Sequence, residues 1–323
     1  MTSKSVYQLR NVGLPALTSI DDFASETRLS LGLVRRLSYS SDSFYKTYKL
    51  PKANGGSRTV AQPSRALKAV QAWILRNVLD ELSSSPYSKG FEIGTSILDN
   101  ATPHVGSNYI LSLDLEEFFP SISASKVYGV FSSVGYNKEM ATLLTNLCVY
   151  DGYLPQGAPT SPKLANLICS KLDARIYGYA GPKGITYTRY ADDITLSANT
   201  AIKIQKAKQF INTIISSENL VINKEKTKLC GTRRQKKITG LILSQNGVGI
   251  GRDKYRDLRA KIHHIYTGKS NNVNHVNGLL SFTYAVDKKS YNKIYNYIDG
   301  LKEKGLGVND FNEIHVKISH KKK

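Results

Sequence analysis

Apolar side chains along this chain recur with two periods, and each period predicts a different kind of element. Over residues 64–82 they return every three or four positions, which places them on one face of a helix. Over 109–113, 185–190 and 194–197 the apolar runs are short and rich in β-branched and aromatic residues, as in buried strands. By the same criteria we expect a helix entered at 27–31, and further helices at 123–134, 137–149, 162–176 and 202–215, with three more between 252 and about 305.

Turn residues join several of these strands into hairpins. An Asn-Gly-Gly turn at 54–56 separates alternating segments at 45–50 and 58–61. An Asn-Gly pair at 246–247 separates two short strands within 237–249. Because helices and hairpins are interleaved and no repeat of 20 to 50 residues is present, we predict the α+β class.

The charge balance of the chain is more unusual than its composition. The 323 residues are 41% hydrophobic and 22% charged, as in an ordinary globular protein, but 45 Lys and Arg against 25 Asp and Glu leave a net charge of +20. Such an excess favours a polyanionic partner, above all a nucleic acid, and argues against an ordinary small-metabolite enzyme.

The sequence shows no pattern typical of a membrane span or a signal peptide. No apolar run approaches the roughly 18 to 20 residues of a membrane helix, and the N-terminal residues lack the apolar stretch of a signal peptide. Cys148, Cys169 and Cys230 form no CxxC pair and are odd in number, which favours reduced core thiols. We therefore expect a cytoplasmic protein with no membrane partner.

Three aspartates stand where acidic residues are unfavourable unless they are used. Asp114 follows an apolar strand, and Asp192 and Asp193 lie between two β-branched and aromatic strands. If the strands are neighbours, the three carboxylates converge at one sheet edge, where their mutual repulsion demands a cation. Two divalent ions about 3.5 to 4 Å apart meet that demand and form a phosphoryl-transfer site. Hard oxygen ligands favour Mg²⁺, so we predict two Mg²⁺ ions held by the three aspartates.

Each of these segments also has a purely structural interpretation. Residues 114–117 fit a capping box, with Asp114 as N-cap and Glu117 at the third helical position. Residues 191–193 fit a solvated hairpin turn. In the loop at 154–162, Ser161 is a good N-cap and Pro162 a good first helical residue, while the functional alternative places Gln156 and Gly157 beside a nucleotide.

Taken in order along the chain, these segments resemble a known family. Asp114 with Phe118 and Phe119, then residues 154–157, then residues 190–193, are similar to motifs A, B and C of reverse transcriptases. The resemblance implies a right-hand polymerase with fingers, a palm of antiparallel sheet and helices, and a short helical thumb. It divides the chain into N-terminal helices and fingers at 1–105, a palm with inserted fingers helices at 106–236, and a primer grip, basic thumb and C-terminal tail at 237–323. It also implies that Asp114, Asp192 and Asp193 are catalytic.

The same resemblance implies residues that bind the deoxynucleotide substrate. Lys52 and Arg58 match basic fingers residues that hold the triphosphate, and residues 222–227, with Lys226, look like motif D. Gln156 and Gly157 of the motif B segment complete the set. Phe119, five residues after Asp114, is at the position of the steric gate against a ribose 2′-hydroxyl, although it also fits core packing beside Phe118.

Two further segments narrow the resemblance to bacterial retron reverse transcriptases. Residues 100–104 have the NAxxH pattern, with Asn100 and His104, and residues 238–240 resemble the retron VTG signature with Ile in place of Val. Such enzymes copy part of a dedicated noncoding RNA from the 2′-hydroxyl of a guanosine, giving a branched RNA–DNA product, and act with an accessory effector protein in antiphage defence. The resemblance implies RNA contacts by these segments, including Thr239 and Gly240. For His104 a structural role that supports the palm stays open, whereas metal ligation is disfavoured because no second ligand lies at a useful spacing.

The segment after residue 251 is a strongly basic amphipathic helix. Only Asp253 and Asp257 offset its five cations, and this imbalance favours a phosphate-facing surface over a merely solvated one. The cations are Arg252, Lys254, Arg256, Arg259 and Lys261.

Three other functions are alternatives to a retron reverse transcriptase. A group II intron or diversity-generating reverse transcriptase is disfavoured by the segment at 100–104 and by the short ending. A noncatalytic RNA-binding scaffold is disfavoured by the three intact aspartates. An RNA-directed RNA polymerase is disfavoured by Phe119.

Overall fold

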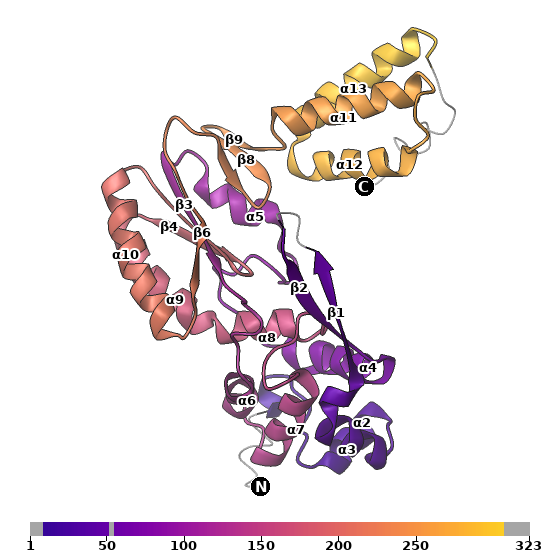
Figure 1. Ribbon diagram of the computed structural model, residues 1–323, viewed down its shortest axis with the longest axis vertical. Helices are drawn as coiled ribbons and strands as arrows, with labels where there is room; N and C mark the ends of the chain where they lie inside the picture. The colour runs from indigo at the N-terminus through magenta and orange to yellow at the C-terminus, as the bar shows by residue number, and fades with distance from the viewer. Residues whose placement is uncertain (1–8, 52–54, 307–323) are drawn as a thin grey trace. The chain divides into compact units, whose positions relative to one another are not determined.

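The computed structural model describes residues 9–51 and 55–306, and the chain divides into two compact units (Figure 1). The first unit comprises Met1–Thr95 and Leu111–Leu229. The second unit comprises Ser96–Ile110 and Cys230–Lys323. Each unit therefore combines segments from two separate parts of the sequence.

The first unit begins with helices and a long hairpin. Helices α2 (Ile20–Thr27) and α3 (Leu31–Tyr39) each begin at a serine whose hydroxyl accepts a hydrogen bond from the first helical turn. Strands β1 (Tyr45–Pro51) and β2 (Ser57–Pro63) pair antiparallel, and the hairpin feeds helix α4 (Arg65–Ile74). A single π-helical turn, η2 (Leu75–Leu79), ends this helix.

A four-stranded sheet in the order β4-β5-β3-β6 forms the centre of the first unit. Its strands are β3 (Tyr109–Leu115), β4 (Thr186–Tyr190), β5 (Asp193–Ala198) and β6 (Ile222–Cys230). Helices α9 (Ser170–Ala180) and α10 (Ala201–Ser217) lie along this sheet, where α9 contacts β4 and α10 contacts β5 (Figure 1). The unit also contains helices α6 (Ala124–Ser133), α7 (Lys138–Cys148) and α8 (Ser161–Ile168).

Buried apolar residues on β3 and β5 fix the positions of the acidic residues that these strands carry. Leu111 and Leu113 on β3, and Ile194 and Leu196 on β5, are almost completely buried. Burying such a side chain stabilises the fold by about 1.5 to 3 kcal/mol. The carboxylates therefore stand on strands that the core holds in fixed register.

The second unit has two apolar clusters. In one, helix α5 (Ile97–Ala101) packs with a small antiparallel sheet made of β7 (Lys236–Ile238), β8 (Leu241–Ser244) and β9 (Gly247–Gly249). In the other, helices α11 (Arg252–Tyr266), α12 (Val273–Val286) and α13 (Lys288–Glu303) pack around Leu258, Ile262 and Ile294.

Most of the expected elements are confirmed, but several boundaries differ. The helix expected at 64–82 leaves α-helical geometry after Ile74, where the π-turn places both Val78 and Leu79 in the core. The helix expected at 162–176 is two helices, because the backbone at Cys169 has ψ near −2°. Arg28 takes a left-handed conformation that ends α2, so the next helix begins only at Leu31. The segment at 237–249 holds three strands instead of two.

In the described part of the chain, no helix is both long enough and apolar enough to cross a membrane.

Candidate active site

The structure brings the three aspartates of the predicted site together in the first unit. Asp114 lies in β3, Asp193 begins β5, and β3 and β5 are neighbours in the sheet. The backbone N–H of Leu115 donates to the carbonyl oxygen of Asp192 at 3.1 Å, which ties the hairpin turn to the strand that carries Asp114. Asp114 is not a helix N-cap, because β3 continues through Leu115.

Asp192 lies in a hairpin turn, which was the purely structural interpretation of residues 191–193. Tyr190 pairs with Asp193, so Ala191 and Asp192 form a two-residue turn, and Ala191 has a left-handed φ of 57°. The two interpretations are therefore compatible. A tight turn is the means by which the sheet presents these carboxylates.

Electrostatics show that the three carboxylates interact. Burial raises the pKa of Asp193 to about 6, and the charges of Asp192 and Asp114 contribute to that rise. Burial also raises the pKa of Asp192; the charge of Asp114 adds to the effect, and the charges of Lys226 and Arg58 oppose it. The site therefore holds more negative charge than its surroundings stabilise.

Lys226 supplies part of the missing positive charge. From β6 its Nζ donates to Oδ1 of Asp114 at 2.9 Å and to Oδ2 at 3.0 Å. This hydrogen bond and the surrounding negative charges raise the pKa of Lys226. Lys226 therefore lies at the carboxylates.

The other predicted nucleotide-binding residues differ in what the structure shows of them. Arg58 is exposed on β2 and acts electrostatically on Asp192, whereas Lys52 lies outside the described residues. Gln156 accepts a hydrogen bond through its backbone oxygen from the N–H of Ala61, at 2.9 Å. A Cβ on Gly157, whose φ is 133°, would lie 2.7 Å from the carbonyl oxygen of Ala61. Glycine is thus required there for close approach to β2, and helix α8 begins at Ser161 with Thr160 as its N-cap, one residue earlier than expected.

Aromatic side chains line the same region. Phe118 is buried, whereas Phe119 is only half-buried, and its ring centroid lies 6.3 Å from that of Phe91. Phe91 is 48% exposed with a left-handed φ of 61°, and it also contacts the Tyr190 ring. Sequence reasoning missed Phe91, since no local pattern places residue 91 beside residues 119 and 190.

The donor chemistry of the carboxylate site fits a divalent cation. Within residues 9–51 and 55–306, no three His, Cys, Asp or Glu side chains already form a metal-ligand set. The crowded carboxylates and the lysine bound to Asp114 nevertheless show that positive charge is favourable at this position. Carboxylate oxygens are the ligands that Mg²⁺ prefers.

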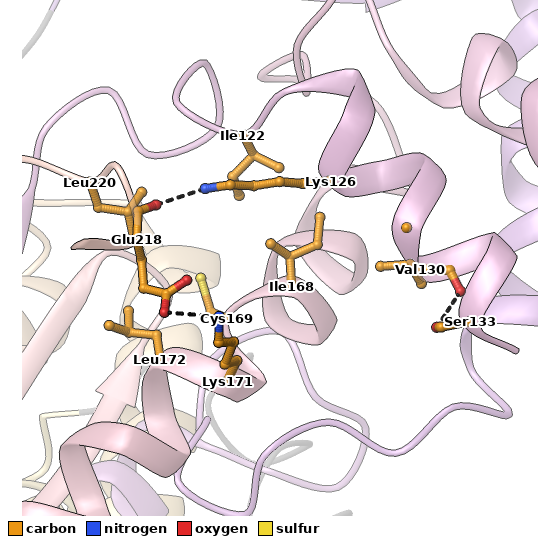
Figure 2. A pocket seen from close by; sticks show the side chains of 11 residues that line it. Ile122, Lys126, Val130, Ser133, Ile168, Cys169, Lys171, Leu172, Glu218 and Leu220 are labelled. Carbon is orange, nitrogen blue, oxygen red and sulfur yellow. Dashed lines mark hydrogen bonds and ion pairs between the residues drawn. The ribbon is translucent and has the colours of Figure 1, made fainter. Parts of the chain in front are cut away.

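A pocket of about 530 Å³ lies apart from these residues in the first unit (Figure 2). Its walls include Ile122, Val130 and Leu172, and Lys126 donates across its rim to the backbone oxygen of Glu218 at 2.8 Å. None of the predicted site residues lines it. It is therefore no part of the candidate active site.

In the second unit the structure brings together the two retron-type segments. Asn100 and His104 are completely buried, in α5 and in the 3₁₀ turn η3 (Thr102–His104) that follows it. Thr239 and Gly240 form the turn between β7 and β8, both with positive φ, and the Thr239 hydroxyl donates to the carbonyl oxygen of Ile97 at 3.4 Å. The burial of His104 favours its structural interpretation.

The basic face of α11 is presented as expected. Arg252, Arg256 and Arg259 are exposed, and Lys261, which is half-buried, pairs with Asp257. The guanidinium of Arg259 lies 4.2 Å from the ring centroid of Tyr297. Cations therefore cover the side of α11 that is opposite its apolar core.

Comparison with known proteins identifies the family. The model of the family described as reverse transcriptase (RNA-dependent DNA polymerase) matches residues 50–243. The chain is 55% identical over 311 residues to the retron Ec86 reverse transcriptase of Escherichia coli, which covers 96% of this chain and 97% of that protein. It is 33% identical over 301 residues to the retron Mx65 reverse transcriptase of Myxococcus xanthus, covering 85% of this chain and 70% of that protein.

Among solved structures, a telomerase from Candida albicans in complex with a fragment of telomeric RNA is similar with a TM-score of 0.47 and 13% identity, over 78% of this chain and 56% of that chain. The matched family region contains the three aspartates, Lys226 and Thr239. The chain therefore belongs to the bacterial retron reverse transcriptases, which are RNA-directed DNA polymerases of the α+β, right-hand fold.

Proposed function

We propose that this enzyme copies part of one cognate, structured noncoding RNA into single-stranded DNA. Synthesis would start from a 2′-hydroxyl of that RNA and leave a branched RNA–DNA product. The observation that carries the proposal is the 55% identity with a retron reverse transcriptase across nearly the whole chain.

The carboxylate site is proposed as the centre of nucleotidyl transfer. Reverse transcriptases use divalent metal ions, and we assign two Mg²⁺ ions to Asp114, Asp192 and Asp193. When bound, such ions lower the pKa of the attacking hydroxyl and stabilise the pyrophosphate leaving group.

The neighbouring side chains would bind and select the deoxynucleotide. Arg58 and Lys52 would neutralise its triphosphate, and Lys226 would exchange its contact with Asp114 for a phosphate oxygen. Gln156 and Gly157 would border the nucleotide, with Phe119 excluding a ribose 2′-hydroxyl by steric clash.

Recognition of the RNA is proposed for the part of the chain after the palm and for the segment just before it. The cations of α11 would neutralise phosphates of any RNA: the exposed Arg252, Arg256 and Arg259, and the half-buried Lys261. Thr239 and Gly240, on their half-buried turn, would contact the cognate RNA, and the buried Asn100 and His104 would support that surface. In this scheme residues 1–105 form the fingers, 106–236 the palm and 237–323 the primer grip and thumb.

We further propose that the enzyme acts in the cytoplasm, with an accessory effector protein, in antiphage defence. This part of the proposal follows the retron family membership alone. A phage challenge of cells that carry the complete operon, with wild-type enzyme or Asp193→Asn, tests whether DNA synthesis is required for protection.

Sequencing the nucleic acid that copurifies with the full chain tests the central proposal. We expect one RNA species joined to one DNA species, with a 2′,5′ linkage that a debranching nuclease cleaves. The Asp193→Asn variant should retain the RNA and lack the DNA. A mixture of unrelated RNAs, or DNA with an ordinary 5′ end, would contradict the proposal.

A second experiment separates recognition from catalysis. Thr239→Ala should impair copying of the cognate RNA and leave extension of a generic annealed primer–template largely intact, because the carboxylates are untouched. Equal loss on both templates would show that the turn at Thr239 supports the fold and does not select the RNA.

A further inference from the structure

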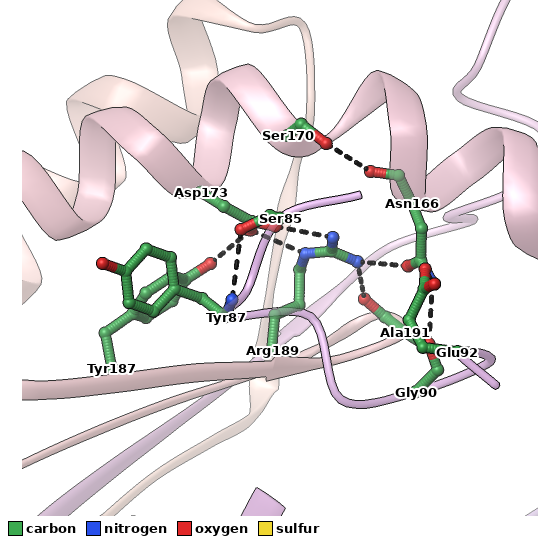
Figure 3. Close-up of polar contacts among 10 residues, drawn as sticks. All are labelled: Ser85, Tyr87, Gly90, Glu92, Asn166, Ser170, Asp173, Tyr187, Arg189 and Ala191. Carbon is green, nitrogen blue, oxygen red and sulfur yellow. Dashed lines mark hydrogen bonds and ion pairs between the residues drawn. The ribbon is translucent and has the colours of Figure 1, made fainter. Parts of the chain in front are cut away.

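Arg189, three residues before Asp192, is completely buried in the first unit. A buried charge is stable only when it is paired and hydrogen-bonded. Its Nε donates to Oδ1 of Asp173 and its Nη2 donates to Oδ2, each at 2.8 Å, so the pair is bidentate (Figure 3). Asp173 on α9 is completely buried as well.

The free arm of this guanidinium reaches the catalytic hairpin. Nη1 donates to the backbone oxygen of Ala191 at 3.1 Å and to Oδ1 of Asn166 on α8 at 3.0 Å (Figure 3). Ala191 is the turn residue with a left-handed φ, a conformation that an alanine holds only when its surroundings impose it. Arg189 therefore ties the strained turn to two helices.

The same turn is confined from a second direction by the loop that precedes α5. Lys89 donates through its backbone N–H to the carbonyl oxygen of Arg189 at 2.7 Å, and the N–H of Arg189 donates to Tyr87 at 2.8 Å. A Cβ on Gly90 would lie 2.8 Å from the backbone nitrogen of Ala191. Asn166 connects this loop to Arg189, because its Nδ2 donates to the carbonyl oxygen of Gly90 at 2.7 Å.

We propose that Arg189, held by Asp173, is a positioning residue for DNA synthesis that fixes the Ala191 turn and with it Asp192 and Asp193. The three carboxylates repel one another, so a turn without this tie would relax away from Asp114. A displacement of about 1 Å at a reacting centre can lower the rate about a hundredfold. The inference rests on the catalytic role proposed above for Asp192 and Asp193.

A double variant tests the proposal without leaving a buried charge unpaired. Arg189→Met with Asp173→Leu replaces the ion pair by apolar side chains of similar size, an exchange that buried ion pairs often tolerate. We expect kcat for primer extension to fall at least about tenfold, with the KM for deoxynucleotide within about threefold. Binding of Mn²⁺, followed by electron paramagnetic resonance without substrate, should weaken several-fold. A folded variant with wild-type kcat and Mn²⁺ affinity would overturn the proposal.

A second variant reaches the same turn and keeps the ion pair. Gly90→Ala places a methyl group against Ala191 and should lower kcat and Mn²⁺ affinity in the same direction. If the double variant does not fold, Gly90→Ala alone tests the proposal. Wild-type kcat and wild-type Mn²⁺ affinity in Gly90→Ala would then overturn it.

The matched control is Arg175→Met, which removes a cation from α9, the helix that carries Asp173. Arg175 is exposed and pairs with Glu218, away from the hairpin, so kcat and Mn²⁺ binding should stay at wild-type values. Asp193→Asn is measured alongside. If it keeps full activity, the catalytic assignment fails; if it is inactive while the Arg189 and Gly90 variants are normal, only the present inference fails.

Discussion

The two units of this enzyme differ in where they place charged side chains. The first unit buries several of them, as with Asp114, Arg189 and Asp173, although Asp193 is exposed at the start of β5. In the second unit the helix α11 keeps its cations at the surface and buries only apolar residues such as Leu258 and Ile262.

This difference follows from what each unit does with its charges. Burial strengthens interactions between charges, as in the ion pair of Arg189 and Asp173. A catalytic centre requires such a water-poor environment, whereas a surface that holds a polyanion gains from exposed cations that release counterions. Substitutions should therefore have different consequences in the two units.

The largest effect is expected at the aspartates of the hairpin turn. Asp192→Asn or Asp193→Asn should lower the rate of DNA synthesis by about a thousandfold or more, because charge that stabilises the transition state is lost. RNA affinity in a gel-shift assay on the same preparation should change by no more than about threefold. The exposed Asp253→Asn on α11 is the matched control and should keep full synthesis. Full polymerase activity in either active-site variant would show that these carboxylates are not catalytic.

A smaller effect is expected from reversing exposed charges. Arg256→Glu with Arg259→Glu should weaken binding to every RNA by about ten- to a hundredfold. The slope of log affinity against log salt should flatten by about one for each lost phosphate contact. Lys206→Glu with Lys208→Glu, on the exposed side of α10 in the first unit, provides the control. If both pairs weaken binding equally, the net charge of the chain and not the α11 surface determines affinity.

Sugar selection should respond to a single half-buried ring. Phe119→Ala should raise the ratio of ribonucleotide to deoxynucleotide incorporation about tenfold, since the selection works by steric exclusion. The buried neighbour supplies the control, because Phe118→Leu should lower thermal stability and leave the ratio unchanged. Single-nucleotide incorporation measures both. An unchanged ratio in Phe119→Ala would assign that ring to the core.

The smallest effect concerns a buried titratable group in the second unit. Burial lowers the pKa of His104 to about 4. An unfolded histidine has a pKa of about 6.5, so below that pH the unfolded chain binds a proton that the folded chain does not. Stability should therefore be unaffected above about pH 6.5 and fall as the pH decreases from about 6.5 towards 4.

Replacing this histidine should remove that dependence. His104→Gln should reduce the slope of the unfolding free energy by up to about 1.4 kcal/mol per pH unit in this range. The exposed His275→Gln is the matched control. Denaturant unfolding at pH 7, 6 and 5 measures the slope, and an unchanged slope in His104→Gln would show that His104 is not the group responsible.

Much of the fold could be predicted from sequence because its elements have strong local signals. Helices α11, α12 and α13 follow from apolar spacing, and the hairpin at β4 and β5 follows from two apolar runs separated by residues 191–193. The points at which helices end or break were not predicted. The left-handed Arg28, the π-turn after Ile74 and the break at Cys169 are set by how each segment packs, and propensity carries no trace of them.

Local spacing and composition were enough to predict the order of most elements, the acidic positions at strand ends and the excess of positive charge on α11. Helix α5 and strand β6 were not predicted, and neither were the side chains that meet across the fold. Lys226 meets Asp114 from 112 residues away, Phe91 meets Phe119, and Arg189 joins Asp173 to the turn at Ala191. Such contacts arise where the core brings distant strands and helices into register, and burial there requires a partner for every charge.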